Sequence, residues 1–125
     1  EIHENLGFDT RMLKALFRQE VHEQSAAYAD NRLSLFCAQY GKCAVTGQVF
    51  ESLGDIHCHH KLPKNRGGRD NYQNLIIVRE SVHILIHATS ESTIAKYLSE
   101  LSLNKRQLAK LNKLRKEAGN PPVSA

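Results

Sequence analysis

The stretch HHKLPKNRGGRDNYQNLIIVRESVHILIH, residues 59–87, holds four of the seven histidines of this 125-residue chain. Two of them are adjacent at its start and two stand four residues apart at its end, with a glycine-rich and basic segment between. Histidine changes charge near neutral pH and serves both as a metal ligand and as a proton carrier. We therefore expect this stretch to determine the fold and to carry the chemistry.

The two later histidines, His83 and His87, lie in the segment RESVHILIHA, whose apolar residues Val82, Leu85 and Ile86 have helical spacing. Residues four apart share one helix face, so two imidazole nitrogens can meet a single divalent cation. The alternative is a pair of surface histidines on an amphipathic helix. For this short motif alone the alternative is preferred, because such pairs often arise by chance.

The two earlier histidines, His59 and His60, change this balance. Residues 43–46 and 55–60 are predicted to form two short extended segments joined by glycine-containing turns. Neighbours in an extended segment point to opposite faces, so one imidazole can bind metal with the helical pair while the other faces a substrate water. A polar strand end with unrelated histidines remains the alternative. Residues 61–73 are predicted to be loop, flanked by the apolar run 74–78.

Helices are expected on both sides of this core. The first spans residues 10–25 after Asp9 or Thr10, with one apolar stripe. The members of that stripe are Leu13, Leu16, Phe17 and Val21. A second helix runs from about Asp30 to Tyr40, with Asp30 as its cap and Gly41 as its stop. Two more begin after Ser90 and Asn104, and the last ends at Gly119.

Composition indicates an ordinary globular protein that is soluble and intracellular, with cytoplasmic as the expected location and no membrane association. The net charge is +4, and the basic residues concentrate in the second half of the chain. That distribution permits a nucleic-acid partner, although a solvated helix face gives a similar count. The three cysteines, Cys37, Cys43 and Cys58, form no CxxC pair, so free thiols are expected.

The spacing of these residues resembles the HNH nuclease motif of the ββα-metal superfamily. The matching residues are His59-His60, Pro63, Gly67-Gly68, Asn74-Leu75 and His83, followed by His87. The resemblance implies an α+β fold with a ββα-metal (HNH) core. That core comprises a short antiparallel hairpin and a metal-bearing helix, flanked by N- and C-terminal helices. The resemblance also implies a division of the chain into a helical lead-in (1–41), a nuclease core (42–90) and a helical extension (91–125).

A narrower resemblance covers residues 28–120. The segments YADNRLSLFCAQYGKCAVTG, SESTIAKYLSEL and KLNKLRKEAGN are similar to the C-terminal endonuclease region of group II intron-encoded reverse transcriptase/maturase proteins. This implies DNA nicking at an intron insertion site, with a reverse transcriptase parent chain and intron RNA as further partners. A freestanding relative, or a toxin-like or phage nuclease, is an open alternative. Target sequence and oligomeric state stay open.

The resemblance assigns His60 and Asn74 to catalysis. His60 is the expected general base for a water, and Asn74 is expected to tie the loop and so fix His60. His59, His83 and His87 are the expected ligands of one divalent ion. Magnesium or manganese is expected for catalysis, and zinc or nickel is expected to bind a purified sample.

Many HNH domains also hold a structural zinc on two CxxC pairs. The corresponding positions here are Cys43, Thr46, Arg79 and Val82, so no structural zinc is expected. Apolar packing must replace it, and Cys43 is predicted to be a small buried residue. The residues expected to supply that packing are Val45, Phe50, Leu75, Ile77 and Val82.

Four basic residues, Lys61, Lys64, Arg66 and Arg69, are expected to contact DNA phosphates beside the cut. Gly67 and Gly68 are expected to let the backbone approach the nucleic acid closely. The basic residues of the last helix, Arg106 and Arg115 among them, form either a DNA-tracking face or a solvated surface, and the solvated surface is slightly preferred. The function favoured by the sequence is a metal-dependent HNH DNA endonuclease, and the alternative is a non-catalytic, metal-stabilised nucleic-acid-binding module.

Overall fold

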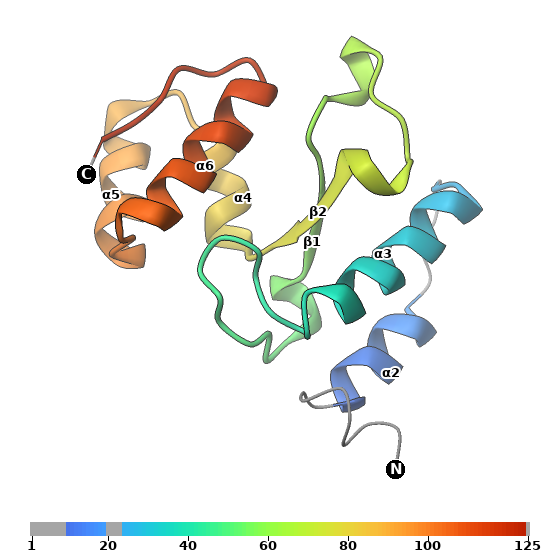
Figure 1. Cartoon of the computed structure of the whole chain (residues 1–125). Helices are drawn as coiled ribbons and strands as arrows, with labels where there is room; N and C mark the ends of the chain where they lie inside the picture. The colour runs from blue at the N-terminus through green and yellow to red at the C-terminus, as the bar shows by residue number, and fades with distance from the viewer. Residues whose placement is uncertain (1–9, 20–23, 125) are drawn as a thin grey trace.

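The computed structural model describes residues 10–19 and 24–124. Within these residues the fold is α+β, with one two-stranded antiparallel sheet and five α-helices (Figure 1). The helices are α2 (Thr10–Arg18), α3 (Ala26–Ala38), α4 (Glu80–His87), α5 (Glu91–Leu101) and α6 (Lys105–Glu117). The strands are β1 (His57–His60) and β2 (Leu75–Val78), and three short 3-10 turns lie at Leu53–Asp55, Lys64–Arg66 and Tyr72–Asn74. None of the described helices has the length and apolar character needed to cross a membrane.

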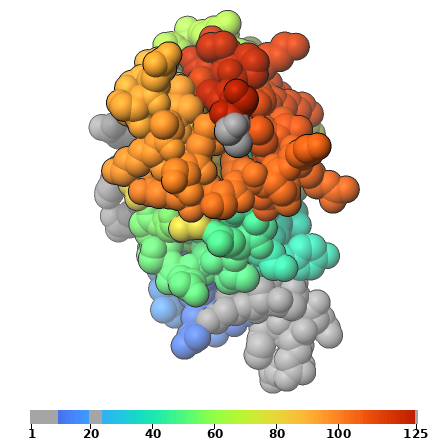
Figure 2. All heavy atoms as spheres, turned by 90° about the vertical axis from the view of Figure 1, so that its left-hand side faces the viewer, coloured from blue at the N-terminus to red at the C-terminus, as the bar shows by residue number. Residues whose placement is uncertain are grey.

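The sheet lies between two groups of helices. Helices α2 and α3 lie on one side of it, and α4, α5 and α6 lie on the other (Figure 1). Figure 2 shows that α5 and α6 together cover the upper part of one face of the molecule, above the segment that follows α3. One buried apolar cluster connects the two groups, because it includes Leu16 and Phe36 as well as Leu111 and Leu114.

β1 pairs with a different segment from the predicted one, residues 43–46. His59 of β1 lies opposite Ile76 of β2, so the run 74–78 supplies a strand and does not merely flank the loop. Residues 43–46 form a tight turn, closed by the bond from the Gly47 N–H to the Cys43 carbonyl (2.9 Å). The Ala44 N–H donates to the Ile77 carbonyl of β2 (3.0 Å), and the residues that flank the turn form the single bridge Lys42–Val49.

The predicted apolar packing around Cys43 is confirmed. Cys43 is 2% exposed, and the five apolar residues predicted to pack around it are all buried. Its sulfur accepts main-chain N–H groups from Thr46 (3.5 Å) and Arg79 (3.4 Å). Both residues are among the four positions that were compared above with the zinc-binding cysteines of HNH domains. The thiol therefore joins the 43–47 turn to the start of α4.

The N-terminal helices differ from the predictions. α2 ends at Arg18, and the predicted stripe fails at Phe17, which is 73% exposed because its neighbour Leu16 takes the core-facing position. Asp9 and Val21 lie outside the described residues. α3 begins four residues before Asp30, because the Ser25 hydroxyl accepts the Tyr28 N–H (2.9 Å) and caps it there.

The predicted C-terminal helices are confirmed. α5 follows Ser90, although the Ser90 side chain makes no capping bond to the helix. α6 begins with a reciprocal capping box between Asn104 and Gln107. It places Leu111 and Leu114 in the core and ends before Gly119, which has a φ of 92°. Gly41 is also left-handed, as predicted, with a φ of 66°.

Candidate metal centre and adjoining histidine

Three histidines converge between β1 and α4. His59, His83 and His87 each place a ring nitrogen within 4.8 Å of the others. Their ring centroids are 4.8–5.2 Å apart, and each pair meets edge to face. The structure thus brings together the three side chains predicted as metal ligands. Local geometry explains this, since His83 and His87 are one turn apart on α4, and β1 turns His59 toward that helix.

The chemistry of this group suits a divalent cation. His59 is 2% exposed, and its Nε2 atom is buried with no hydrogen-bond partner among the described residues. A buried nitrogen without a partner is costly, and a bound cation would satisfy it. Burial, followed by the nearby imidazoles, lowers the pKa of His59 to about 3. Burial chiefly lowers the pKa of His83 to about 4 and also lowers that of His87. Neutral imidazoles are the form that binds metal.

A fourth histidine, His57, lies beside this group. Its ring stacks on His83 with centroids 5.2 Å apart. It is two residues from His59 and therefore on the same face of β1. No role was predicted for it, and its contact is with a ligand candidate rather than with the three-nitrogen group itself.

His60 is separate from the three-histidine group. Its Nε2 atom lies 2.7 Å from Oδ1 of Asp70, and its ring stacks on Tyr28 with centroids 5.7 Å apart. Because an ionised carboxylate can only accept, Nε2 carries the hydrogen, and in the neutral ring Nδ1 keeps the lone pair. Hydrogen bonds from His60 and then Ser25 lower the pKa of Asp70, which keeps the carboxylate ionised.

Asp70 was not predicted as a site residue. Its other carboxylate oxygen accepts the Ser25 hydroxyl (2.6 Å), and Lys64 Nζ lies 3.4 Å from Oδ1. Its main-chain carbonyl accepts the Asn31 amide (2.8 Å), so α3 also fixes the loop. In the sequence, Asp70 was visible only as an acidic residue shortly after the glycine pair. No periodicity relates such a loop residue to His60, ten residues earlier on a strand.

Asn74 ties the loop across its base. Its side chain accepts the Leu62 N–H (2.8 Å) and donates to the carbonyls of Leu62 (3.1 Å) and Arg69 (2.9 Å). The predicted tie is therefore present, but it acts on the loop that carries Asp70. The described contacts of the Asn74 side chain do not include His60.

The glycines of this loop have a structural role that is separate from the predicted approach to nucleic acid. Gly67 has a φ of 96°, which favours glycine. A Cβ at Gly68 would lie 1.8 Å from the Leu62 carbonyl oxygen. Gly68 therefore allows the loop to close on itself, and this requirement exists without any nucleic acid.

Of the four basic residues predicted to contact DNA, Lys64, Arg66 and Arg69 are exposed and Lys61 is half-buried. Lys64 lines a pocket of about 410 Å³ together with Tyr28, Pro63 and the histidines at 59, 60, 83 and 87. Arg66 instead reaches the end of α6, where Nη1 lies 3.4 Å from the Ala118 carbonyl.

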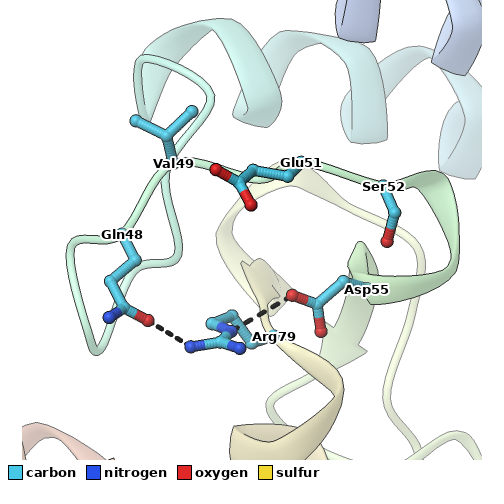
Figure 3. A pocket seen from close by; sticks show the side chains of 6 residues that line it. All are labelled: Gln48, Val49, Glu51, Ser52, Asp55 and Arg79. Carbon is cyan, nitrogen blue, oxygen red and sulfur yellow. Dashed lines mark hydrogen bonds and ion pairs between the residues drawn. The ribbon is translucent and has the colours of Figure 1, made fainter.

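A larger pocket, of about 600 Å³, lies at the other end of α4 (Figure 3). Its side chains bond to one another. Arg79 donates to Gln48 and to Asp55 Oδ2 (3.1 Å), and Asp55 Oδ1 accepts the Glu80 N–H (3.0 Å). The polar lining thus supports the start of α4, and it holds none of the predicted site residues.

No protein-family model, curated protein or solved structure gave a significant match to the chain. The site is therefore defined by its geometry, as three convergent imidazoles beside a separate histidine–aspartate pair.

Proposed function

We propose that the chain is a metal-dependent endonuclease domain of the HNH, ββα-metal type that hydrolyses phosphodiester bonds in DNA. The observation that carries this proposal is that the adjacent histidines His59 and His60 have different partners. Three imidazoles converge on one point, whereas His60 lies outside that group and opens on the same pocket. A purely structural metal knot has no need of an additional histidine held apart by a carboxylate.

In this proposal His60 acts as general base. Its Nδ1 lone pair accepts a proton from water as the water oxygen bonds to phosphorus. The bond from phosphorus to the 3′-oxygen breaks, which leaves a 5′-phosphate and, after protonation, a 3′-hydroxyl. Asp70 holds the ring in the required tautomer through Nε2 and stabilises the imidazolium that forms.

His59, His83 and His87 would hold the divalent ion. When bound, such an ion supplies Lewis-acid stabilisation of the charge that develops on the leaving oxygen. Magnesium or manganese is proposed for turnover, because both support hydrolysis at oxygen-rich substrate sites. Zinc or nickel is proposed to bind more tightly, since imidazole suits both.

The narrower proposal is that the chain is the DNA-nicking domain of a group II intron reverse transcriptase, or a freestanding relative, in the cytoplasm. Its support is the resemblance of residues 28–120 described above. The 3′-hydroxyl left by the proposed cut is the end from which a reverse transcriptase could extend. A reverse transcriptase parent chain and intron RNA are proposed partners on the same ground.

A plasmid-nicking assay tests the function. The parent is expected to nick supercoiled DNA with Mg²⁺ or Mn²⁺. His60→Ala is expected to bind metal normally and to nick at least about 100-fold more slowly than the parent. His83→Ala is expected to lose both metal binding and nicking. A parent that binds DNA and metal but nicks with neither ion would contradict the proposal and support the non-catalytic module.

A further inference from the structure

The end of α4 is held by residues from the C-terminal extension. Arg115 of α6 is 1% exposed, and its described partners are main-chain carbonyls. Its Nη1 donates to the carbonyls of Leu85 (2.6 Å) and Ala88 (2.9 Å), and its Nε donates to Pro121 (2.8 Å). Beyond α6, the side chain of Asn120 donates to the Ile86 carbonyl (2.8 Å).

These bonds surround a candidate metal ligand. His87 is the last residue of α4, and the carbonyls immediately before and after it belong to Ile86 and Ala88. Asn120 bonds the first of these carbonyls, and Arg115 bonds the second. The main-chain position of His87 is therefore set by the C-terminal extension.

The physical need for such support follows from the length of α4. The helix has eight residues, which is too short to be stable alone, and helix ends fray first. Its last carbonyls have no partners within the helix, and a cation at this end also interacts favourably with the helix dipole. The start of α4 is fixed independently by Asp55, which accepts the Glu80 N–H and also bonds to Arg79, the residue before the helix (Figure 3). The ligand-bearing helix is thus held at both ends by different parts of the chain.

We propose that the C-terminal extension is a working part of the metal centre, with Arg115 and Asn120 as positioning residues that fix His87 for metal binding. This inference rests on the metal-holding part of the proposed function. It assigns a role to a helix whose other basic residues are exposed, and it distinguishes Arg115 from them.

Cobalt titration followed by visible absorption tests this role, because the cobalt band reports both affinity and ligand geometry. The variants are Arg115→Met and Asn120→Ala, and the matched control is Arg106→Met, which removes an exposed arginine from the same helix. Each is titrated well below its own unfolding temperature, with folding checked by circular dichroism. Arg115→Met is expected to weaken Co²⁺ binding about 10-fold or more and to alter the band. Asn120→Ala should produce a smaller loss in the same direction, and the control should match the parent.

Arg115→Lys provides the rescue, since an ammonium can still donate to the carbonyls and should restore part of the affinity. Parent-like affinity and spectrum in both Arg115→Met and Asn120→Ala would overturn the inference. If Arg115→Met does not fold, parent-like cobalt binding by Asn120→Ala is sufficient by itself to overturn the inference. A parent that binds no cobalt would instead refute the metal centre itself, so the two failures are distinguishable.

Discussion

At the scale of single residues, the adjacent histidines have opposite environments. His59 is buried against α4 with a nitrogen that has no described hydrogen-bond partner, whereas His60 is half-buried and bonds to a carboxylate. The alternation of side chains along β1 produces this difference from two identical amino acids. Asp70 is the residue that gives His60 a defined orientation.

Asp70→Ala should therefore slow nicking without weakening metal binding. The His60 ring loses its acceptor and can rotate or change tautomer, so the single-turnover rate is expected to fall about 10-fold or more. Asn71→Ala, which alters the neighbouring exposed side chain, is the control. Nicking by Asp70→Ala at the parent rate would show that His60 needs no orienting carboxylate.

The buried histidines also predict how stability depends on pH in chelator-treated protein. The pKa of His59 is about 3 in the folded state, against an ordinary value of 6.5. The unfolded chain therefore takes up a proton that the folded chain does not, so stability is lost as pH falls from about 6.5 toward 3. Thermal melts of the parent and His59→Phe should diverge in slope, with the variant less sensitive. Parallel slopes would mean that His59 is not buried as described.

At the scale of elements, the 61–74 loop is a scaffold for Asp70. Gly68→Ala would force a Cβ against the Leu62 carbonyl, so the loop must shift and Asp70 must shift with it. We expect a melting temperature lower by about 4 °C or more, together with slower nicking. Gly54→Ala is the matched control, because a Cβ there meets nothing within 4 Å. Equal behaviour of the two variants would contradict the close packing of this loop.

The elements also show what could be predicted from the sequence. His83 and His87 were predictable, because their relation depends only on the pitch of one helix. The partner of β1 was not, since strand pairing is non-local and two apolar runs were available, at 43–46 and 75–78. Arg115 was hidden among exposed cations of the same helix, and only tertiary packing separates it from them.

At the scale of the whole molecule, the site joins distant parts of the chain. Ser25 and Asn31 hold Asp70 from the N-terminal side. Arg115 and Asn120 hold α4 from the C-terminal side. One buried cluster connects these parts, so residues 42–90 share their core with both flanking regions.

DNA binding by the whole molecule should depend on salt and only weakly on sequence. Arg69 is exposed, and its replacement by Gln should reduce the slope of log affinity against log salt by about 1. Arg66→Gln should change this slope less, because Arg66 reaches Ala118. Fluorescence anisotropy with a labelled duplex measures both slopes. An unchanged slope in Arg69→Gln would show that Arg69 does not contact DNA phosphates.

The most direct measurement of the central claim is an anomalous diffraction map from crystals of the chain loaded with Mn²⁺ or Zn²⁺. The predicted result is one peak bonded by nitrogens of His59, His83 and His87, with His60 unliganded and still paired with Asp70. A peak that includes His60 among its ligands, or one located away from β1 and α4, would contradict the account.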